Sequence, residues 1–198
     1  MATSVREKNK LDKKRKILKT AFTLFAYKGF EKTTISDIVE AADIGRGTFY
    51  NYFKSTKEVL KRVIEKLNVE ISEVLNESLK NSTTMEEYIF NSLKSYFDAV
   101  STEEMIHFHR NNQKYIRGVT YGDKMKKSII STLHNNFLKT TDIHFENEEN
   151  FKLLSFALAS SAIELFISSN QGYFKATNEE MAKFITDIYM RGIPTKTT

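Results

Sequence analysis

The sequence contains no cysteine, a single proline (Pro194) and only seven glycines among its 198 residues. Without cysteine, the chain has no disulfide, no cysteine-ligated zinc and no thiol nucleophile. The scarcity of proline and glycine favours long helices, because these residues are the usual interruptions. The most apolar run, from Leu153 to Ile167, contains Glu164 and is shorter than the roughly 20 residues that cross a bilayer. We therefore expect an all-α protein that does not enter the membrane.

Charge is unevenly distributed along the chain. Residues 1–57 hold 13 Lys and Arg against 6 Asp and Glu, whereas the remainder holds 17 against 19. A basic N-terminal quarter indicates contact with a polyanion, and a solvated basic arm with no partner is the alternative. The charged N-terminus also lacks the apolar segment of a signal peptide, so we expect a cytoplasmic protein.

Apolar residues recur at helical spacing through most of the chain, and no strand alternation competes with them. This pattern predicts about nine helices. They are expected around 17–28, 35–42, 46–53, 56–75, 85–100, 102–115, 123–139, 151–169 and 179–190. Gly29 suits the position just past the end of the first helix. Thr34 with Asp37 and Ser55 with Glu58 have the spacing of capping boxes, which open helices.

The second and third helices are short and are separated by a tight turn, which is typical of a helix-turn-helix unit. Ala41 and Ala42 are small enough for the two helices to pack closely, and Asp43 tolerates the left-handed conformation that a tight turn requires. We expect a DNA-binding domain over 1–56, with the helix-turn-helix at about 34–53, and a helical regulatory and dimerisation domain over 57–198.

The third helix divides into two faces. Phe49 and Phe53 lie four residues apart and should point into the core of the small domain. Polar residues remain outside, and they are Arg46, Thr48, Tyr50, Asn51, Tyr52 and Lys54. Arginine pairs with guanine edges, asparagine with adenine and threonine with the thymine methyl, whereas tyrosine and lysine reach phosphates. Gly47 has no side chain and lets the backbone approach the groove.

Several segments of this region closely resemble the N-terminal domain of TetR/AcrR-family regulators. They are Ala21-Phe22-x-Leu24-Phe25, Gly29-Phe30, Thr33-Thr34-Ile35, Ala41-Ala42, Gly47-Thr48-Phe49-Tyr50-x-Tyr52-Phe53 and Lys57-x-x-Leu60. The chain departs from the family pattern at Asp43, where glycine is common, and at Gly45, where serine is common. Both residues can adopt the necessary backbone geometry, but Gly45 has no side chain to contact DNA.

The resemblance implies roles for individual residues. Phosphate contacts are implied for Thr34, Tyr50, Tyr52 and Lys57, and base contacts for Arg46, Thr48 and Asn51. For the tyrosines, ordinary helix packing is the alternative. The basic run from Lys13 to Lys16 could contact phosphate or the minor groove, or could simply be a solvated helix start.

In the resembled family, helices four to eight enclose a ligand pocket, and helices eight and nine form a four-helix dimer interface. The candidate pocket residues here are Tyr96, Phe97, Phe108, Tyr115, Tyr121, Phe137, Phe156 and Glu164. The candidate interface residues are Leu158, Ala162, Leu165, Phe184 and Ile188. The eighth helix is apolar nearly all round, which requires burial on several sides, either by a partner subunit or wholly within the monomer. For Glu164, a surface position or satisfaction by a partner is the favoured alternative to a place in the pocket.

The sequence has no motif that indicates a metal site, an enzyme active site or a cofactor site. His107 and His109 are two residues apart and point in different directions on a helix, so we expect no metal site. There is no nucleophile motif and no phosphate-cradling loop, so we expect neither an enzyme nor a cofactor. The sequence predicts a ligand-responsive repressor that binds a palindromic double-stranded operator as a homodimer and is released by an unknown small-molecule effector. An architectural DNA-binding protein without a ligand and an activator are the alternatives.

Overall fold

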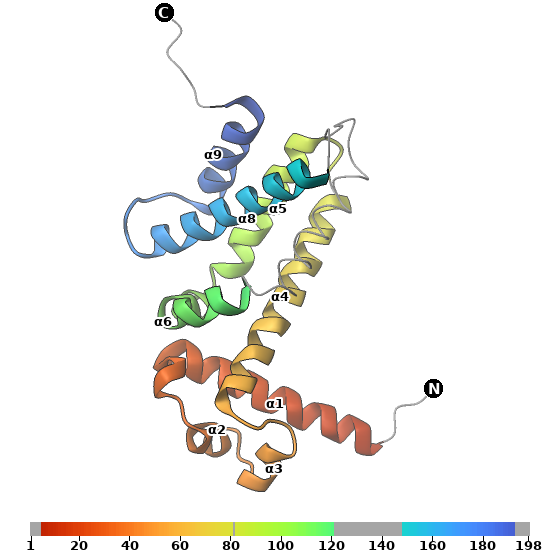
Figure 1. Cartoon of the computed structure of the whole chain (residues 1–198), viewed down its shortest axis with the longest axis vertical. Coiled ribbons are helices and arrows are strands. Elements are labelled where there is room, and N and C mark those ends of the chain that lie inside the picture. Colours follow the sequence, from red (N-terminus) through yellow and green to blue (C-terminus); the bar gives the residue numbers. More distant parts are fainter. Residues whose placement is uncertain (1–4, 81, 121–147, 193–198) are drawn as a thin grey trace, which may run out of the picture. The chain divides into compact units, whose positions relative to one another are not determined.

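The computed structural model describes residues 5–80, 82–120 and 148–192, which fold into helices and connecting turns with no strand (Figure 1). The elements are α1 (Val5–Lys28), the 3-10 helix η1 (Phe30–Lys32), α2 (Ile35–Ala41), α3 (Arg46–Tyr50), α4 (Thr56–Lys80), α5 (Met85–Val100), α6 (Glu103–Thr120), α8 (Glu148–Asn170) and α9 (Asn178–Arg191). The all-α prediction is confirmed. The helix expected at 123–139 lies outside the described residues.

The chain forms two compact units. Unit 1 comprises Met1–Asn68 and Glu103–Thr120, and unit 2 comprises Val69–Thr102 and Tyr121–Thr198. Helix α4 begins in unit 1 and ends in unit 2. The expected boundary was at residue 56. The observed division differs from it because α6 packs with the N-terminal helices, although α4 and α5 separate them in the sequence.

The core of unit 1 is formed by apolar residues from α1, α2, α3, α4 and α6. Its most buried members include Ile17, Phe25, Ile38, Phe49, Phe53, Val59 and Phe108. Phe49 and Phe53 are both essentially inaccessible, as the phase of the third helix predicts. Gly29 has a φ of 81° directly after α1, and Asp43 has a φ of 49° in the turn between α2 and α3. Both predicted turn residues therefore adopt the left-handed conformation that ends a helix or makes a tight turn.

Polar contacts fasten α6 to the end of α1. The Asn112 side chain is 1% exposed; its Nδ2 donates to the carbonyls of Phe25 and Phe108, and its Oδ1 accepts from the Phe30 N–H, each at 2.8 Å. Asn112 itself has non-helical backbone angles inside α6, at φ −132° and ψ 15°. Asn111 Nδ2 adds a bond of 2.7 Å to the Ala26 carbonyl. The Phe25 carbonyl also accepts from the Gly29 N–H at 3.1 Å, so the side chains of α6 add to the hydrogen bonding at the end of α1.

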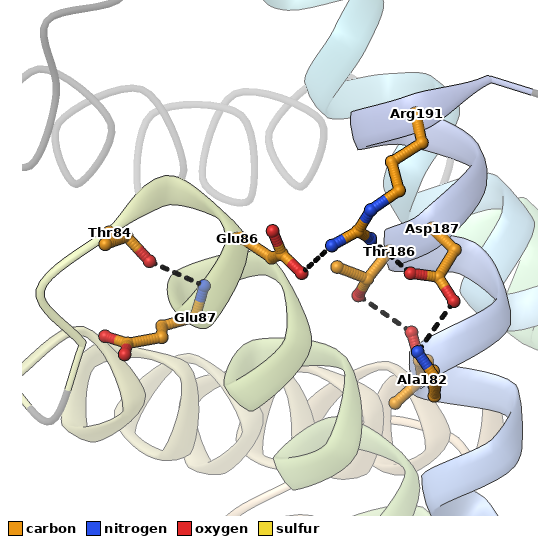
Figure 2. Close-up of polar contacts among 8 residues, drawn as sticks. Thr84, Glu86, Glu87, Ala182, Thr186, Asp187 and Arg191 are labelled. Atoms are coloured by element: carbon orange, nitrogen blue, oxygen red, sulfur yellow. Dashed lines mark hydrogen bonds and ion pairs between the residues drawn. The ribbon is translucent and has the colours of Figure 1, made fainter.

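In unit 2, α5 packs extensively against α9. Figure 2 shows how charged side chains join the two helices: Arg191 of α9 contacts both Asp187 of its own helix and Glu86 of α5, the latter at 2.5 Å. In the same view, the Thr186 hydroxyl donates to the Ala182 carbonyl at 2.8 Å. That internal bond lets the polar side chain of Thr186 lie buried in an otherwise apolar helix face.

Helix α8 is 23 residues long and begins earlier than the sequence predicts. By length and composition alone, its segment Lys152–Asn170 could cross a membrane, a test that the core helices of soluble proteins also pass. Within unit 2, Phe166, Leu158 and Ala162 of this helix are buried, whereas Leu153 is 67% exposed. The helix therefore has one face in the core of its own unit and an apolar remainder outside it.

Candidate nucleic-acid interface

Helix α3 presents a short polar surface on unit 1. Arg46, Gly47 and Asn51 are exposed, and Tyr50 is 56% exposed. Thr48 is half-buried. The buried rings of Phe49 and Phe53 fix the rotation of the helix, so the polar residues between them face outward, as a helix that enters a major groove requires.

Helix α3 occupies the position of the recognition helix in a helix-turn-helix unit. It is shorter than predicted, because its regular part ends at Tyr50. Asn51 is the C-cap residue, and its N–H donates to the Gly47 carbonyl at 3.2 Å. Tyr52 is half-buried in the turn that follows, with its ring centroid 6.5 Å from that of Phe53. Tyr52 thus combines core packing with partial exposure. Helix packing and phosphate contact, the two roles considered for it, are therefore compatible.

Two capping networks hold the helices on either side of α3. The Thr34 hydroxyl accepts from the Asp37 N–H at 3.2 Å and donates to the Asp37 carboxylate at 2.9 Å. At the start of α4, the Ser55 hydroxyl accepts from the Glu58 N–H at 3.2 Å, and the Glu58 carboxylate accepts from the Lys54 N–H at 2.8 Å. Both predicted capping pairs are therefore present, and the hydroxyl of Thr34 already has partners within the protein.

Acidic side chains of unit 1 are occupied by neighbours. The Lys28 ammonium lies 2.6 Å from the Asp37 carboxylate, and this contact, together with hydrogen bonds from Thr34, lowers the Asp37 pKa to about 2. The Glu31 carboxylate accepts from the Tyr115 hydroxyl at 2.8 Å. Lys28 therefore compensates the charge of Asp37 on this surface.

The basic residues at the start of the chain lie on a helix. Helix α1 begins at Val5, so Lys13, Lys14, Arg15 and Lys16 occupy regular helical positions. Lys13, Arg15 and Lys16 are exposed, and Arg15 approaches Asp12 only at 3.9 Å. The ordered helix places these charges on a rigid support, but their contact with DNA remains a prediction.

The comparison with known proteins agrees with this arrangement. Residues 17–63 match the family model described as bacterial regulatory proteins, tetR family. This part of the chain is similar to the regulatory proteins of the tetR family. The match begins in α1 and ends in α4, so it contains the whole helix-turn-helix.

Relatives of this chain are named as transcriptional regulators. The HTH-type regulator YfiR of Bacillus subtilis is 35% identical over 101 residues, which cover 51% of this chain and 47% of YfiR. The chain therefore spans about half the length of that relative. The icaADBC negative regulator IcaR of Staphylococcus aureus is 25% identical over 89% of this chain and 95% of its own.

The fold also resembles solved structures of two regulators over about nine tenths of the chain. The regulator FadR of Bacillus subtilis, solved in complex with stearoyl-CoA, has a TM-score of 0.71 at 15% identity, covering 91% of this chain and 99% of its own. The fatty acid degradation regulator FadR of Bacillus halodurans has a TM-score of 0.72 at 16% identity, with coverage of 91% and 96%. At such identities, the likeness concerns the fold alone.

The candidate pocket residues are divided between the two units. Phe108 and Tyr115 belong to unit 1, where Phe108 packs on Phe22 with ring centroids 5.0 Å apart. In unit 2, Tyr96 lies beside Phe97 and Phe166, with centroid distances of 5.6 and 6.5 Å. Phe97 is fully buried, whereas Phe156 is 42% exposed and Glu164 is exposed. Tyr121 and Phe137 lie outside the described residues.

The candidate interface residues also fall into two groups. Leu158 and Ala162 are buried within unit 2, at 6% and 4% exposure, so they serve the core of their own chain. Phe184 is 58% exposed, and Leu165 and Ile188 are half-buried. Only this second group has side-chain surface left for a partner.

The roles of two residues of unit 1, Asn112 and Ser36, were not predicted from the sequence. Asn112 occupies the buried phase of α6, at helical spacing from Met105, Phe108 and Tyr115, and a polar residue in such a stripe is a signal of a buried hydrogen-bonding role. Ser36 accepts a hydrogen bond from Arg46 at 2.6 Å. No local sequence pattern predicts the contact between Ser36 and Arg46, because it depends on how α2 and α3 pack.

Proposed function

We propose that this chain is a ligand-responsive transcriptional repressor that binds a palindromic operator as a homodimer in the cytoplasm. The observation that carries the proposal is the recognition helix of the region that matches the tetR family, with Phe49 and Phe53 buried and a polar, basic surface outside. One helix of this length reads few bases, so two-fold repetition supplies the remaining specificity. The repressor role is supported by IcaR, which is named as a negative regulator.

We assign the polar residues of the interface to two kinds of contact. Base edges are read by Arg46, Thr48 and Asn51, with Gly47 allowing close approach. Phosphates are bound by Thr34, Tyr50, Tyr52, Lys54 and Lys57. Phosphate contacts set affinity and its dependence on salt, whereas base contacts set the sequence preference.

The apolar outer surface of α8 and α9 supports dimerisation. Leu153, Phe156 and Phe184 are between 42% and 67% exposed, and they belong to the helices whose other faces form the core of unit 2. A two-fold axis would pair this surface with its own copy, which produces an isologous interface.

The effector is proposed to act through unit 2. Helix α4 begins beside α3 and ends in unit 2, so it is the natural connection between a ligand and the recognition helix. A coupling of about 1–3 kcal/mol would change operator affinity roughly 5- to 150-fold. Because a structural neighbour was solved with stearoyl-CoA, long-chain acyl-CoA belongs among the first compounds to test.

Footprinting on the DNA that flanks this chain's own gene tests the proposal. We expect protection of a palindrome with half-sites about one helical turn apart, or further apart if two dimers bind. The experiment is repeated with hydrophobic and cationic compounds, including stearoyl-CoA, and one class should release the DNA. Sequence-independent coating of the DNA that no compound alters would instead indicate an architectural protein.

A further inference from the structure

A side chain of α2 holds the first residue of the recognition helix. Arg46 opens α3, and its Nη2 donates a hydrogen bond of 2.6 Å to the hydroxyl of Ser36, the second residue of α2. The left-handed turn at Asp43 brings the two helices close enough for this contact. Both side chains are exposed, so the pair lies on the surface and not in the core.

The guanidinium of Arg46 has no competing ion pair. Within the described residues, no carboxylate lies at ion-pair distance from Arg46, and the Asp37 carboxylate next to Ser36 is held by Lys28 at 2.6 Å. The positive charge therefore remains available to an outside partner. The serine hydroxyl fixes the direction of the guanidinium without neutralising it.

Most of the hydrogen-bonding groups that the Arg46–Ser36 pair has left for an outside partner are donors. A guanidinium carries five N–H donors, of which the contact with Ser36 uses one. Because the serine oxygen accepts this bond, its own O–H can turn outward as a further donor. In the major groove, guanine offers two adjacent acceptors, O6 and N7, whereas adenine offers an acceptor beside a donor. The guanidinium has donors and no acceptor, so its remaining N–H groups match the two adjacent acceptors of guanine.

We propose that Ser36 is a specificity-determining residue that acts through Arg46: its hydroxyl aims the guanidinium at a guanine in the major groove. A long arginine side chain loses rotational freedom when it pairs with a base, and a partner that holds it beforehand reduces that loss. Base preference at one operator position therefore depends on α2 as well as on the recognition helix. This inference rests on the proposed DNA-binding function and on the base-reading role of Arg46.

The test is a double-mutant cycle with Ser36→Ala, Arg46→Ala and the double variant, measured by fluorescence anisotropy on full-length protein. The duplexes are the footprinted operator, versions with each guanine replaced singly, and random DNA. Arg46→Ala should reduce discrimination at one guanine roughly 5- to 150-fold. Ser36→Ala should reduce discrimination at the same guanine about two- to tenfold and leave random-DNA affinity and the salt dependence unchanged.

Two further comparisons test whether the effect comes from the hydroxyl of Ser36 and acts through Arg46. Ser36→Thr keeps the hydroxyl and should restore discrimination, and Ser36→Ala should have no effect when Arg46 is already alanine. If Ser36→Ala leaves discrimination intact while Arg46→Ala removes it, the inference fails and the proposed function stands. Equal losses on operator and random DNA would make Ser36 a phosphate contact and also overturn the inference. If wild-type protein protects no DNA, the proposed function and the inference both fall.

Discussion

The two units treat buried polar groups differently. In unit 1, the buried Asn112 side chain makes three hydrogen bonds to backbone groups, and the Thr33 hydroxyl donates to the Gly29 carbonyl at 2.7 Å. In unit 2, the buried hydroxyls of Ser78 and Thr186 are hydrogen-bonded, but those of Ser92 and Ser155 are buried without a partner among the described residues. A satisfied polar network rigidifies a core, whereas an unsatisfied hydroxyl costs stability. The buried polar side chains described in unit 1 therefore have partners, whereas two of those in unit 2 carry the cost of an unmade hydrogen bond.

The exposed aromatic residues show a related contrast. On unit 1 they are Tyr27 and Tyr50, whose hydroxyls can bond to water or phosphate. Unit 2 exposes Tyr173 in the turn after α8, but the exposed aromatic residues of α8 and α9 themselves are Phe156 and Phe184, which have no polar group. Exposed apolar side chains that cluster on neighbouring elements mark protein interaction surfaces. The difference separates a surface suited to a polyanion from one suited to a second subunit.

The largest effect is expected from Asn112→Leu. This change leaves the Phe30 N–H buried without an acceptor and should lower the free energy of unfolding by about 2–4 kcal/mol. The matched change in unit 2, Ser92→Ala, removes a hydroxyl that has no partner among the described residues and should be nearly neutral. Urea unfolding followed by circular dichroism measures both. Equal losses from the two variants would remove the contrast between the units.

Phe184→Glu should abolish the dimer while leaving the helices intact. A carboxylate at the centre of an apolar interface has no partner, so we expect the dimer dissociation constant to rise roughly 100-fold or more. Lys183→Gln changes the neighbouring exposed position and should leave the dimer unchanged. Sedimentation velocity decides the outcome. A dimer that survives Phe184→Glu would place the interface on another surface.

Two glycines with the same positive φ allow a comparison of the two units. Gly29 and Gly172 both have a φ of 81°, and neither position is too crowded for a methyl group. Alanine should cost about 1–2 kcal/mol at either site, because the left-handed conformation disfavours a Cβ atom. Only Gly29→Ala should weaken operator binding, since Gly29 joins α1 to η1 in the DNA-binding unit. Parallel thermal melts and gel shifts test this, and a loss of DNA affinity from Gly172→Ala would contradict it.

The smallest effect concerns pH. The folded-state pKa of Asp37 is about 2, below its ordinary value of 3.8, because Lys28 and Thr34 stabilise the carboxylate. The contribution of this carboxylate to stability is therefore complete above about pH 4 and declines as pH falls toward 2. Asp37→Asn should be slightly less stable than wild type at neutral pH, and the difference should shrink over that acidic range. Urea titrations between pH 2 and 7 measure it; a constant difference would contradict the assigned cause.

Local sequence patterns predicted most of the N-terminal unit. The capping pairs of Thr34 and Ser55, the left-handed Asp43 and the inward phase of Phe49 and Phe53 all depend on residues within a few positions of one another. Helical periodicity and capping chemistry report such relations directly.

Contacts between distant residues were not predicted. Asn112 bonds to Phe25, which is 87 residues away, and the Tyr115 hydroxyl reaches Glu31 across 84 residues. Periodicity shows which face of α6 is buried but not which helix covers it. For the same reason Phe108 and Tyr115 were assigned to a ligand pocket, although they pack with α1 and η1.

The membership of α6 in unit 1 has a consequence for biosynthesis. Helices α1 to α3 leave the ribosome early, but the residues that complete their core and bind the end of α1 follow only with Glu103–Thr120. At an elongation rate of about 5–20 residues per second, several seconds pass between the synthesis of α3 and the synthesis of α6. A nascent chain or a truncated product that ends before α6 therefore carries the helix-turn-helix sequence without its complete support.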